Sequence, residues 1–331
     1  MKVIRELLLW LLFIVVIAGG LFTYYARTPI PLERAPLSFE LKPGSSLKSA
    51  AHQIQQAGGL NSEWMFVLLG RVQGKAARIK PGNYQLEHEV TPLKLLSIIS
   101  KGQVEQSSLT VIEGSTFNQL RATLNAEPTL RHDSANLTVA EILKRVGATE
   151  QTPEGLFFPD TYIYEKGSSD LMVLKRAYQL MQRNLRESWE KRDTDLPFKT
   201  PYDALILASI VEKETGQAVD RAMIASVFIN RLRKNMRLQT DPTVIYGMGD
   251  KFDGNLRKRD LSRDTPYNTY TRNGLPPTPI CLPGLAALQA TLHPAPSRAL
   301  YFVARGDGTS HFSSTLIEHN NAVNRFQLKR K

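Results

Sequence analysis

The chain has 331 residues, a length that allows two domains or one domain with extensions, and its 42% hydrophobic content is ordinary for a globular protein with a sizeable core. Lys and Arg number 42 against 31 Asp and Glu, and the net charge of +11 favours a polyanionic partner: nucleic acid, an anionic membrane surface or an acidic wall polymer. The single cysteine, Cys281, excludes an internal disulfide.

An uncharged apolar run from Leu7 to Tyr25 follows a short leader that contains two basic residues. As a helix, its roughly 19 residues span about 28 Å, close to the ~30 Å hydrocarbon core of a bilayer. Tyr24 and Tyr25 close the run as an interfacial aromatic belt would, and the basic leader places the N-terminus in the cytoplasm. We therefore predict a cytoplasmic leader and single-pass transmembrane anchor over residues 1–27.

A cleaved signal peptide is the alternative to a retained anchor. Bulky side chains occupy the place of a small-x-small cleavage site, which favours retention: Leu21, Phe22, Tyr24 and Tyr25. No second apolar run of this length follows, so we expect the rest of the chain to lie outside the cytoplasm. An extracytoplasmic protein has little nucleic acid to bind, so we expect no nucleic-acid partner, and the basic surface indicates the cell wall or the membrane.

Residues 28–37 hold three prolines and are expected to form an extended linker. Beyond the linker, one local pattern occurs three times: a short alternating strand, a turn and an amphipathic helix. The strands are expected over residues 38–41, 83–86 and 108–112, and the helices over 47–56, 93–100 and 117–124. Thr116 and Gln119 form a capping box, and Gly102 is a helix stop. These junctions predict an α+β fold in which small units pack side by side.

A long helix is predicted from Asp170 onward, because large apolar side chains recur at helical spacing and indicate a core-facing stripe: Leu174, Tyr178, Met181, Leu185 and Trp189. Further helices are predicted over 202–215, ended by Gly216, over 220–234, and from Asp241, as N-cap, to 246. Residues 250–283 are rich in loops. Strands over 300–304 and near 311–312 indicate a hairpin.

Glu214 is the strongest candidate for chemistry. On the helix 202–215 it lies one turn beyond Ile210 and Val211, on an apolar stripe that desolvates a carboxylate and raises its pKa. It also lies in the last helical turn, where the helix dipole disfavours a negative charge. Both effects keep Glu214 protonated near neutral pH, as a general acid that donates to a glycosidic oxygen must be. The alternative is a helix-end carboxylate in a salt bridge.

Glu212 is the rival on the same helix. It follows a less apolar stripe, and two residues of helical rotation turn it away from Glu214. We therefore expect Glu212 to support the site, in a pairing with an arginine, without touching the substrate.

Polar and aromatic residues gather in the same half of the chain: Gln239, Thr240, Asp241, Tyr267, Asn268, Thr269 and Tyr270. Such a set suits a carbohydrate, because sugar rings stack on aromatic faces and sugar hydroxyls form bidentate hydrogen bonds with polar side chains. Each of them has an ordinary structural alternative, such as N-cap, turn former or core tyrosine. Their clustering is what indicates a binding site.

Other chemistries have less support in the sequence. The six histidines show no HExxH or HxH spacing, so we expect no metal site and no metal cofactor. The chain also lacks GxGxxG after a strand, GxxxxGK[ST] and GxSxG, which disfavours nucleotide binding and an esterase-type triad.

Several long motifs in order resemble the endolytic murein transglycosylase (MltG or YceG-like) family. They are LASIVEKET at 207–215, SVFINRL at 226–232, LQTDPTVIYG at 238–247, YNTY at 267–270, GLPP at 274–277 and FPDT at 158–161. The resemblance runs from about residue 39 to 320 and includes the single N-terminal anchor. The region 38–106 resembles lysin-motif units only loosely.

The resemblance implies an inner-membrane lyase with its C-terminal part in the periplasm, a lysin-motif-like glycan-binding region at 38–106 and a catalytic domain at 107–331. Such an enzyme cuts the β-1,4 bond between N-acetylmuramic acid and N-acetylglucosamine without water and leaves 1,6-anhydro ends. The family's catalytic glutamate falls on Glu214, which acts first as acid and then as base, with Glu212 and Asp160 as supporting residues. No cofactor is implied, and penicillin-binding proteins are the implied partners.

Two alternatives stay open from the sequence. One is a non-enzymatic anchor that only binds peptidoglycan, and the other is a hydrolase that cuts the same bond with water. The intact glutamate at the end of the helix disfavours the pure binder.

Overall fold

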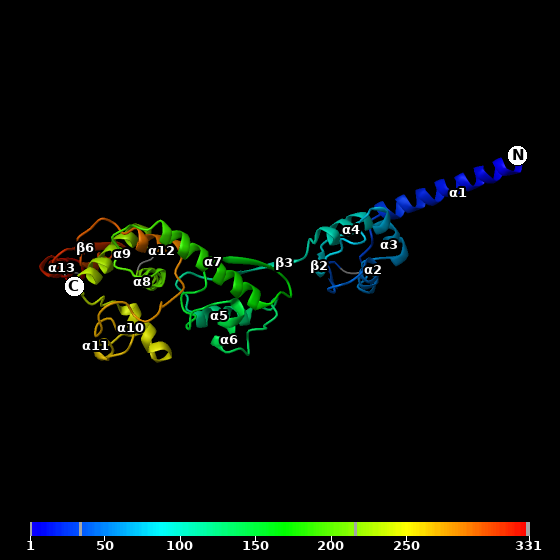
Figure 1. The fold of residues 1–331 in the computed structure, drawn as a ribbon. Helices are drawn as coiled ribbons and strands as arrows, with labels where there is room; N and C mark the ends of the chain where they lie inside the picture. Colours follow the sequence, from blue (N-terminus) through cyan, green and yellow to red (C-terminus); the bar gives the residue numbers. More distant parts are fainter. Residues whose placement is uncertain (1, 33–34, 215–216, 329–331) are drawn as a thin grey trace. The chain divides into compact units, whose positions relative to one another are not determined.

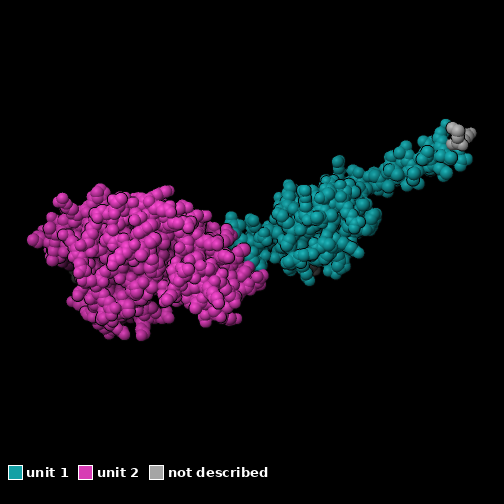
Figure 2. Space-filling model, viewed as in Figure 1, with its two compact units in different colours: residues 1–108, 163–168 teal, residues 109–162, 169–331 magenta. Residues whose placement is uncertain are grey.

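The computed structural model describes residues 2–32, 35–214 and 217–328, and it divides into two compact units, which Figure 2 colours separately. Unit 1 is residues 1–108 with 163–168, and unit 2 is residues 109–162 with 169–331. Both units combine helices with short two-stranded sheets, which confirms the predicted α+β class.

Unit 1 begins with the helix that the apolar run predicted. Figure 1 labels its elements, which are α1 (Lys2–Arg27), β1 (Leu37–Leu41), α2 (Leu47–Gln56), α3 (Glu63–Val72), β2 (Gly82–Leu86) and α4 (Pro92–Lys101). Residues Val3–Arg27 are long and apolar enough to cross a membrane, and the most apolar stretch buries none of its residues in the protein. A signal sequence would have the same properties.

An antiparallel pair of strands and three helices enclose the core of unit 1. β1 pairs with β2, and the opposed Phe39 and Tyr84 stack with ring centroids 5.5 Å apart. Alternate residues of β1 are buried, as a strand with one face on a core requires. Helices α2, α3 and α4 cover this core, which also takes in Ala26 and Ile30 from the end of α1 and the segment after it.

The chain passes from unit 1 to unit 2 within β3 (Gln106–Thr110). It returns to unit 1 within β4 (Thr161–Glu165), for residues 163–168, and then continues in unit 2. These two strands form a sheet of their own.

Unit 2 holds most of the helices. Its elements are α5 (Phe117–Ala126), α6 (Val139–Val146), α7 (Asp170–Glu190), α8 (Pro201–Glu214), α9 (Ala218–Arg233), α10 (Asp241–Met248), the short η1 (Gly249–Lys251), α11 (Lys258–Ser262), α12 (Leu285–Leu292), β5 (Tyr301–Ala304), β6 (Ser310–Ser313), α13 (Leu316–Val323) and η2 (Asn324–Leu328). β5 and β6 form the predicted antiparallel hairpin.

Helix α8 lies at the centre of unit 2. It packs against α7, α9, α10 and α12, and every residue from Ala204 to Val211 is buried. The helix is therefore buried on all sides along this stretch, with Ser209 as its one polar residue, and the polar residues that follow it lie where α8 leaves the core.

Most predicted elements form within a few residues of their expected bounds, including the Thr116–Gln119 capping box and the left-handed Gly102 stop. Three corrections follow. Helices α3, α6, α11, α12 and α13, the short η1 and η2, and strand β4 were not predicted. The threefold pattern does not give three separate units, because its first two copies share one sheet and one core. The N-cap of α10 is Thr240 and not Asp241 as predicted, because Asp241 is already the first residue of the helix. The predicted stop at Gly216, like Thr215, lies outside the described residues.

Candidate active site

Glu214 is the last residue of α8, at the point where the helix leaves the core of unit 2. The buried stretch that ends at Val211 places its carboxyl group beside the apolar interior, and the side chain is only partly exposed. Burial raises the pKa of Glu214 above its usual range, as the sequence predicted. A neutral carboxyl group at this position can donate a proton.

The hydroxyl of Thr240 contacts Glu214 directly. Thr240 Oγ1 donates a hydrogen bond of 2.8 Å to Glu214 Oε2, and this bond opposes the effect of burial on the pKa. Thr240 is itself 1% exposed and is held by its neighbours: its N–H donates to Thr269 Oγ1 at 3.1 Å, and its carbonyl accepts the Thr243 hydroxyl at 2.7 Å. Two buried threonines, Thr243 and Thr269, thus fix Thr240, the donor that orients the Glu214 carboxyl group.

Two opposite charges affect the pKa of Glu214. The Asp241 carboxylate raises the pKa of Glu214, and the Arg231 guanidinium lowers it, both more weakly than burial. Asp241 is exposed, and its Oδ1 accepts a 2.5 Å hydrogen bond from the Tyr270 hydroxyl. Burial, and then this bond and the Asp241 charge, raise the pKa of Tyr270, so the phenol stays a donor. Asp241 and Tyr270 therefore form a fixed pair beside the candidate acid.

Arg231, on α9, is a buried cation that was not singled out from the sequence. Its Nε donates to the Leu300 carbonyl at 2.7 Å and its Nη1 to the Leu238 carbonyl at 2.6 Å, and the guanidinium lies 5.4 Å from the Tyr301 ring centroid. Burial lowers its pKa, and the nearby Tyr301, Tyr270 and Glu214 oppose that shift. Arg231 thus fixes the segment that leads into Thr240.

Glu212 makes different contacts from Glu214, in line with the expected rotation around the helix. Its Oε2 accepts the Gly284 N–H at 2.9 Å, at the start of α12. Burial raises the pKa of Glu212, the Gly284 N–H lowers it, and Glu113 raises it while Arg221 lowers it. Because α8 is buried on all sides, the less apolar stripe that the sequence assigned to Glu212 does not distinguish its environment from that of Glu214. The two glutamates differ in their hydrogen-bond partners, since Glu212 joins α8 to α12 and Glu214 contacts Thr240.

Asn268 shapes the loop that faces α10. It is 0% exposed, and its amide donates to the carbonyls of Asp260, Leu261 and Arg263 at 3.2, 3.0 and 2.7 Å, while its Oδ1 accepts the Tyr270 N–H at 2.8 Å. Both the amide nitrogen and the amide oxygen of Asn268 are therefore hydrogen-bonded to the backbone, and the side chain positions Tyr270.

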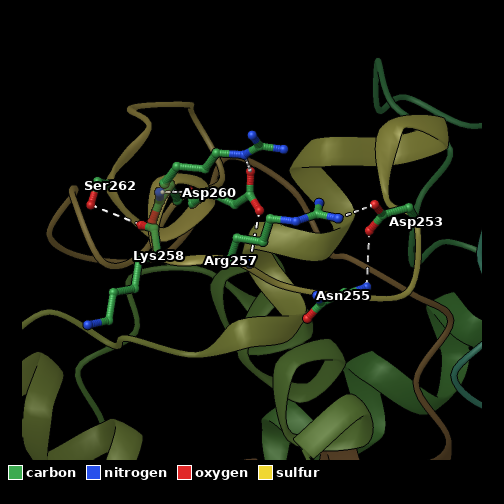
Figure 3. Close-up of polar contacts among 8 residues, drawn as sticks. Asp253, Asn255, Arg257, Lys258, Asp260 and Ser262 are labelled. Atoms are coloured by element: carbon green, nitrogen blue, oxygen red, sulfur yellow. Dashed lines mark hydrogen bonds and ion pairs between the residues drawn. The ribbon is translucent and has the colours of Figure 1, made fainter.

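The loop that Asn268 holds is also stabilised from within, as Figure 3 shows. Asp253 accepts the Arg257 guanidinium at 2.6 Å and the Asn255 N–H at 3.1 Å. Asp260 accepts the Arg257 N–H at 2.9 Å at the start of α11, and Ser262 donates to the Lys258 carbonyl at 3.1 Å. This region, predicted to be rich in loops, is thus a defined structure with one short helix.

Tyr267 belongs to a second chain of contacts. Its ring meets Tyr246 edge to face, with centroids 4.9 Å apart, and its hydroxyl lies 2.9 Å from Thr278 Oγ1. The Tyr246 hydroxyl donates at 3.1 Å to the carboxyl group of Glu154, a residue that is 5% exposed. The same carboxyl group accepts the Phe117 N–H at 3.0 Å. Burial raises the pKa of Glu154 to about 7. Glu154 thus links α5 to α10, a role that its sequence position did not reveal.

The remaining candidates lie at the edges of this arrangement. Gln239 is exposed, has a left-handed backbone (φ 48°), and donates its N–H to the Thr269 carbonyl at 3.1 Å. Asp160 precedes β4, where its Oδ1 accepts the Thr161 N–H at 2.7 Å and its carbonyl accepts the Val111 N–H at 2.9 Å. Among the described residues, none of the polar contacts of Asp160 involves Glu214 or Thr240. The structure therefore places Asp160 at a strand junction.

The predicted site residues fall into two groups. Thr240, Asp241, Thr269 and Tyr270 gather around Glu214, whereas Asn268 and Tyr267 support the loops behind them. Sequence reasoning missed Arg231 and Glu154, both of which are buried ionisable side chains on otherwise ordinary helix and turn segments. Within the part of the chain that the structure describes, no group of three or more His, Cys, Asp or Glu side chains is arranged to hold a metal ion.

Comparisons with known proteins agree with one another. The model of the YceG-like family matches residues 39–325. The chain is 30% identical to the endolytic murein transglycosylase of Bacillus subtilis (strain 168), across 94% of this chain and 91% of that protein. It is 26% identical to the protein of the same name from Streptococcus pneumoniae serotype 2 (strain D39), across 92% of this chain but 62% of that longer protein.

A solved structure is also similar. The crystal structure of a YceG-like protein from Listeria monocytogenes superimposes with a TM-score of 0.55 at 31% sequence identity, and the match covers 86% of this chain and 97% of that one.

Proposed function

The chain belongs to the YceG-like family, and we propose on this basis that it is an endolytic murein transglycosylase that cuts peptidoglycan glycan strands from within. The observation that carries the proposal is the environment of Glu214: a partly buried carboxyl group with a raised pKa, oriented by the Thr240 hydroxyl at 2.8 Å.

The proposed reaction uses one carboxyl group twice. Neutral Glu214 donates its proton to the oxygen of the β-1,4 bond between N-acetylmuramic acid and N-acetylglucosamine, the C1–O bond breaks, and its electron pair stays on the leaving oxygen. The Glu214 carboxylate then takes the proton of the muramic C6 hydroxyl, whose oxygen bonds to C1. The product is a 1,6-anhydro end, and no water is consumed.

The surroundings of Glu214 suit both halves of this cycle. Burial and the Asp241 charge favour the neutral acid, and the Thr240 hydroxyl and Arg231 favour the carboxylate that acts as base. Because the nucleophile belongs to the substrate, the two carboxylates of the usual glycosidase are not needed. We propose that Asp241, Tyr270 and Gln239 contact the sugars. The buried Thr269 supports Thr240 from behind. Tyr267, Asn268 and Glu212 hold the loops and helices in place, and Asp160 has a supporting role.

We also propose that α1 is a retained single-pass anchor in the inner membrane, with the C-terminal part in the periplasm. Ala26 is 7% exposed and Ile30 is 3% exposed, and both lie in the core of unit 1, with Phe22 packed against it. Cleavage near the end of α1 would remove part of that core, and this argues against a signal peptide.

The region 38–106 is proposed to bind glycan as a lysin-motif-like module. The catalytic domain is proposed to begin at residue 107, and penicillin-binding proteins that build the same strands are the proposed partners. These proposals rest on the family resemblance and on the net charge of +11, which suits an acidic wall polymer.

Digestion of purified, uncrosslinked glycan strands by the detergent-solubilised full chain tests the proposed function, with products identified by mass spectrometry. We expect internal cuts with anhydromuramic ends, each lighter by one water than a reducing end. Reducing ends would instead identify a hydrolase, and intact strands that stay bound to the protein would identify a non-enzymatic anchor.

A further inference from the structure

Helix α3 of unit 1 exposes an unusual row of large apolar side chains. Trp64 is 68% exposed, Leu68 is 41% exposed and Val72 is 66% exposed. They are spaced by four residues and so share one face of the helix, about 12 Å long. The opposite face, with Phe66, Leu69 and Gly70, is buried in the core of unit 1. The exposed row therefore does not serve the folding of unit 1.

The start of α3 is joined to the end of the proposed membrane anchor. The hydroxyl of Tyr25, in the last turns of α1, donates a 3.1 Å hydrogen bond to the carbonyl of Ser62, the residue that precedes α3. Helix α1 also contacts α3 and α4, and Figure 1 shows α3 beside the C-terminal end of α1. Trp64 follows Ser62 by two residues, so it is held near the level at which α1 leaves the membrane.

The charges around this face suit an anionic lipid surface. Arg71 lies in the last turn of α3 and is exposed, and Lys75 and Arg78 follow directly. The one acidic residue of the helix, Glu63, is occupied by His52 at 2.6 Å. Basic residues near lipid headgroups favour binding to anionic bilayers, and tryptophan favours the interface itself.

We propose that the face formed by Trp64, Leu68 and Val72 inserts into the outer headgroup region of the membrane that α1 crosses, with Arg71 and Arg78 at anionic headgroups. This proposal rests on the proposed anchor. The face then acts as a second membrane contact, and two contacts hold a protein to a bilayer in a defined orientation better than one. Unit 1, which carries the proposed glycan-binding region, would be seated on the lipid surface.

The test uses the full chain in vesicles of phosphatidylethanolamine and phosphatidylglycerol, with lipids brominated near the headgroup or deep in the acyl chain as quenchers. The chain has three tryptophans, Trp10, Trp64 and Trp189. The double variant Trp10→Phe, Trp189→Phe leaves Trp64 as the fluorophore. We expect its emission to shift to shorter wavelength and to be quenched more by shallow than by deep bromines.

A matched variant separates this proposal from the anchor. Trp64→Phe, Trp189→Phe leaves Trp10, near the start of the apolar run, as the reporter. Quenching of Trp10 with no quenching of Trp64 overturns the docking face and leaves the anchor standing, whereas no quenching of Trp10 overturns the anchor.

Two further controls make the outcome decisive. The first control applies if Trp10→Phe and Trp189→Phe disturb folding. The difference in quenching between wild type and the single variant Trp64→Phe then gives the signal of Trp64 without those two substitutions. Leu68→Glu places a charge on the face, and it should move the Trp64 emission back toward that of water. Trp64 shielded from all bromines as the protein-to-lipid ratio rises would indicate a second copy on this face and would contradict the lipid proposal.

Discussion

The Thr240 hydroxyl, at the start of α10, lies 2.8 Å from Oε2 of Glu214, at the end of α8. The two residues are 26 positions apart in the chain, and the loop between α9 and α10 brings them together. The contact connects a buried helix end to the polar segment that the sequence marked as a carbohydrate site. It also makes the protonation of Glu214 sensitive to one hydroxyl group.

Replacement of Thr240 by Val should raise the pKa of Glu214 further, because the carboxylate loses its donor while burial is unchanged. The alkaline limb of the pH–activity profile should then move to higher pH. Cleavage should fall by about tenfold or more, since the second step needs the carboxylate. Thr240→Ser keeps the hydroxyl and is the control. An unmoved limb in the Val variant would mean that Thr240 does not act on the titrating group.

Replacement of Asp241 by Asn should have the opposite effect on the pH profile. The Asp241 charge raises the pKa of Glu214, so its removal should lower that pKa and move the alkaline limb to lower pH. Because Asp241 is exposed, high salt should reduce the difference between the variant and wild type. Tyr270→Phe removes the 2.5 Å hydrogen bond but keeps the carboxylate, and it should shift the limb less.

Arg231→Gln should destabilise unit 2 by about 3 kcal/mol, because the Leu238 and Leu300 carbonyls lose charged donors. Urea unfolding of Arg231→Gln beside wild type measures the change in the free energy of unfolding. Arg233→Gln, two residues along α9, is the matched control: Arg233 pairs at the surface with Asp195, whose side chain is 97% exposed, and should matter little. Equal effects of the two substitutions would contradict the conclusion that Arg231 stabilises unit 2 through the Leu238 and Leu300 carbonyls.

Glu154 should make stability depend on pH. Its pKa is raised by burial from 4.5 to about 7, so the folded state holds the proton more tightly than the unfolded state does. The resulting stabilisation is fully present below about pH 4.5 and is lost as pH rises through 7. Relative to Glu154→Gln, wild type should lose about 3 kcal/mol of unfolding free energy across this window. A constant difference between them would contradict a buried, titrating Glu154.

The sequence predicted the parts of the fold that have local causes. Capping residues, apolar spacing and the helix stop at Gly102 act within a few residues, and the corresponding helices form where expected. Helix α3 was missed because its apolar residues lie on both faces, and the exposed Trp64, Leu68 and Val72 hide the helical pattern.

The candidate site was predicted less completely than the helices. Glu214 stands out from sequence because a carboxylate ends a long apolar stretch, but the separation of Glu214 from Glu212 depends on tertiary partners, Thr240 for one and the Gly284 N–H for the other. Arg231 and Glu154 were missed for the same reason, since what makes them important is burial and contact with segments far along the chain.

The most direct test of the account is the digestion of peptidoglycan by Glu214→Gln beside Glu212→Gln, with anhydromuramic ends counted by mass spectrometry. The two substitutions are chemically identical and lie two residues apart on α8. We predict that Glu214→Gln makes no anhydro ends, although it folds and binds strands, and that Glu212→Gln keeps measurable activity. Undiminished cleavage by Glu214→Gln would contradict the account and would move the catalytic acid to another residue, with Glu212 the first to examine.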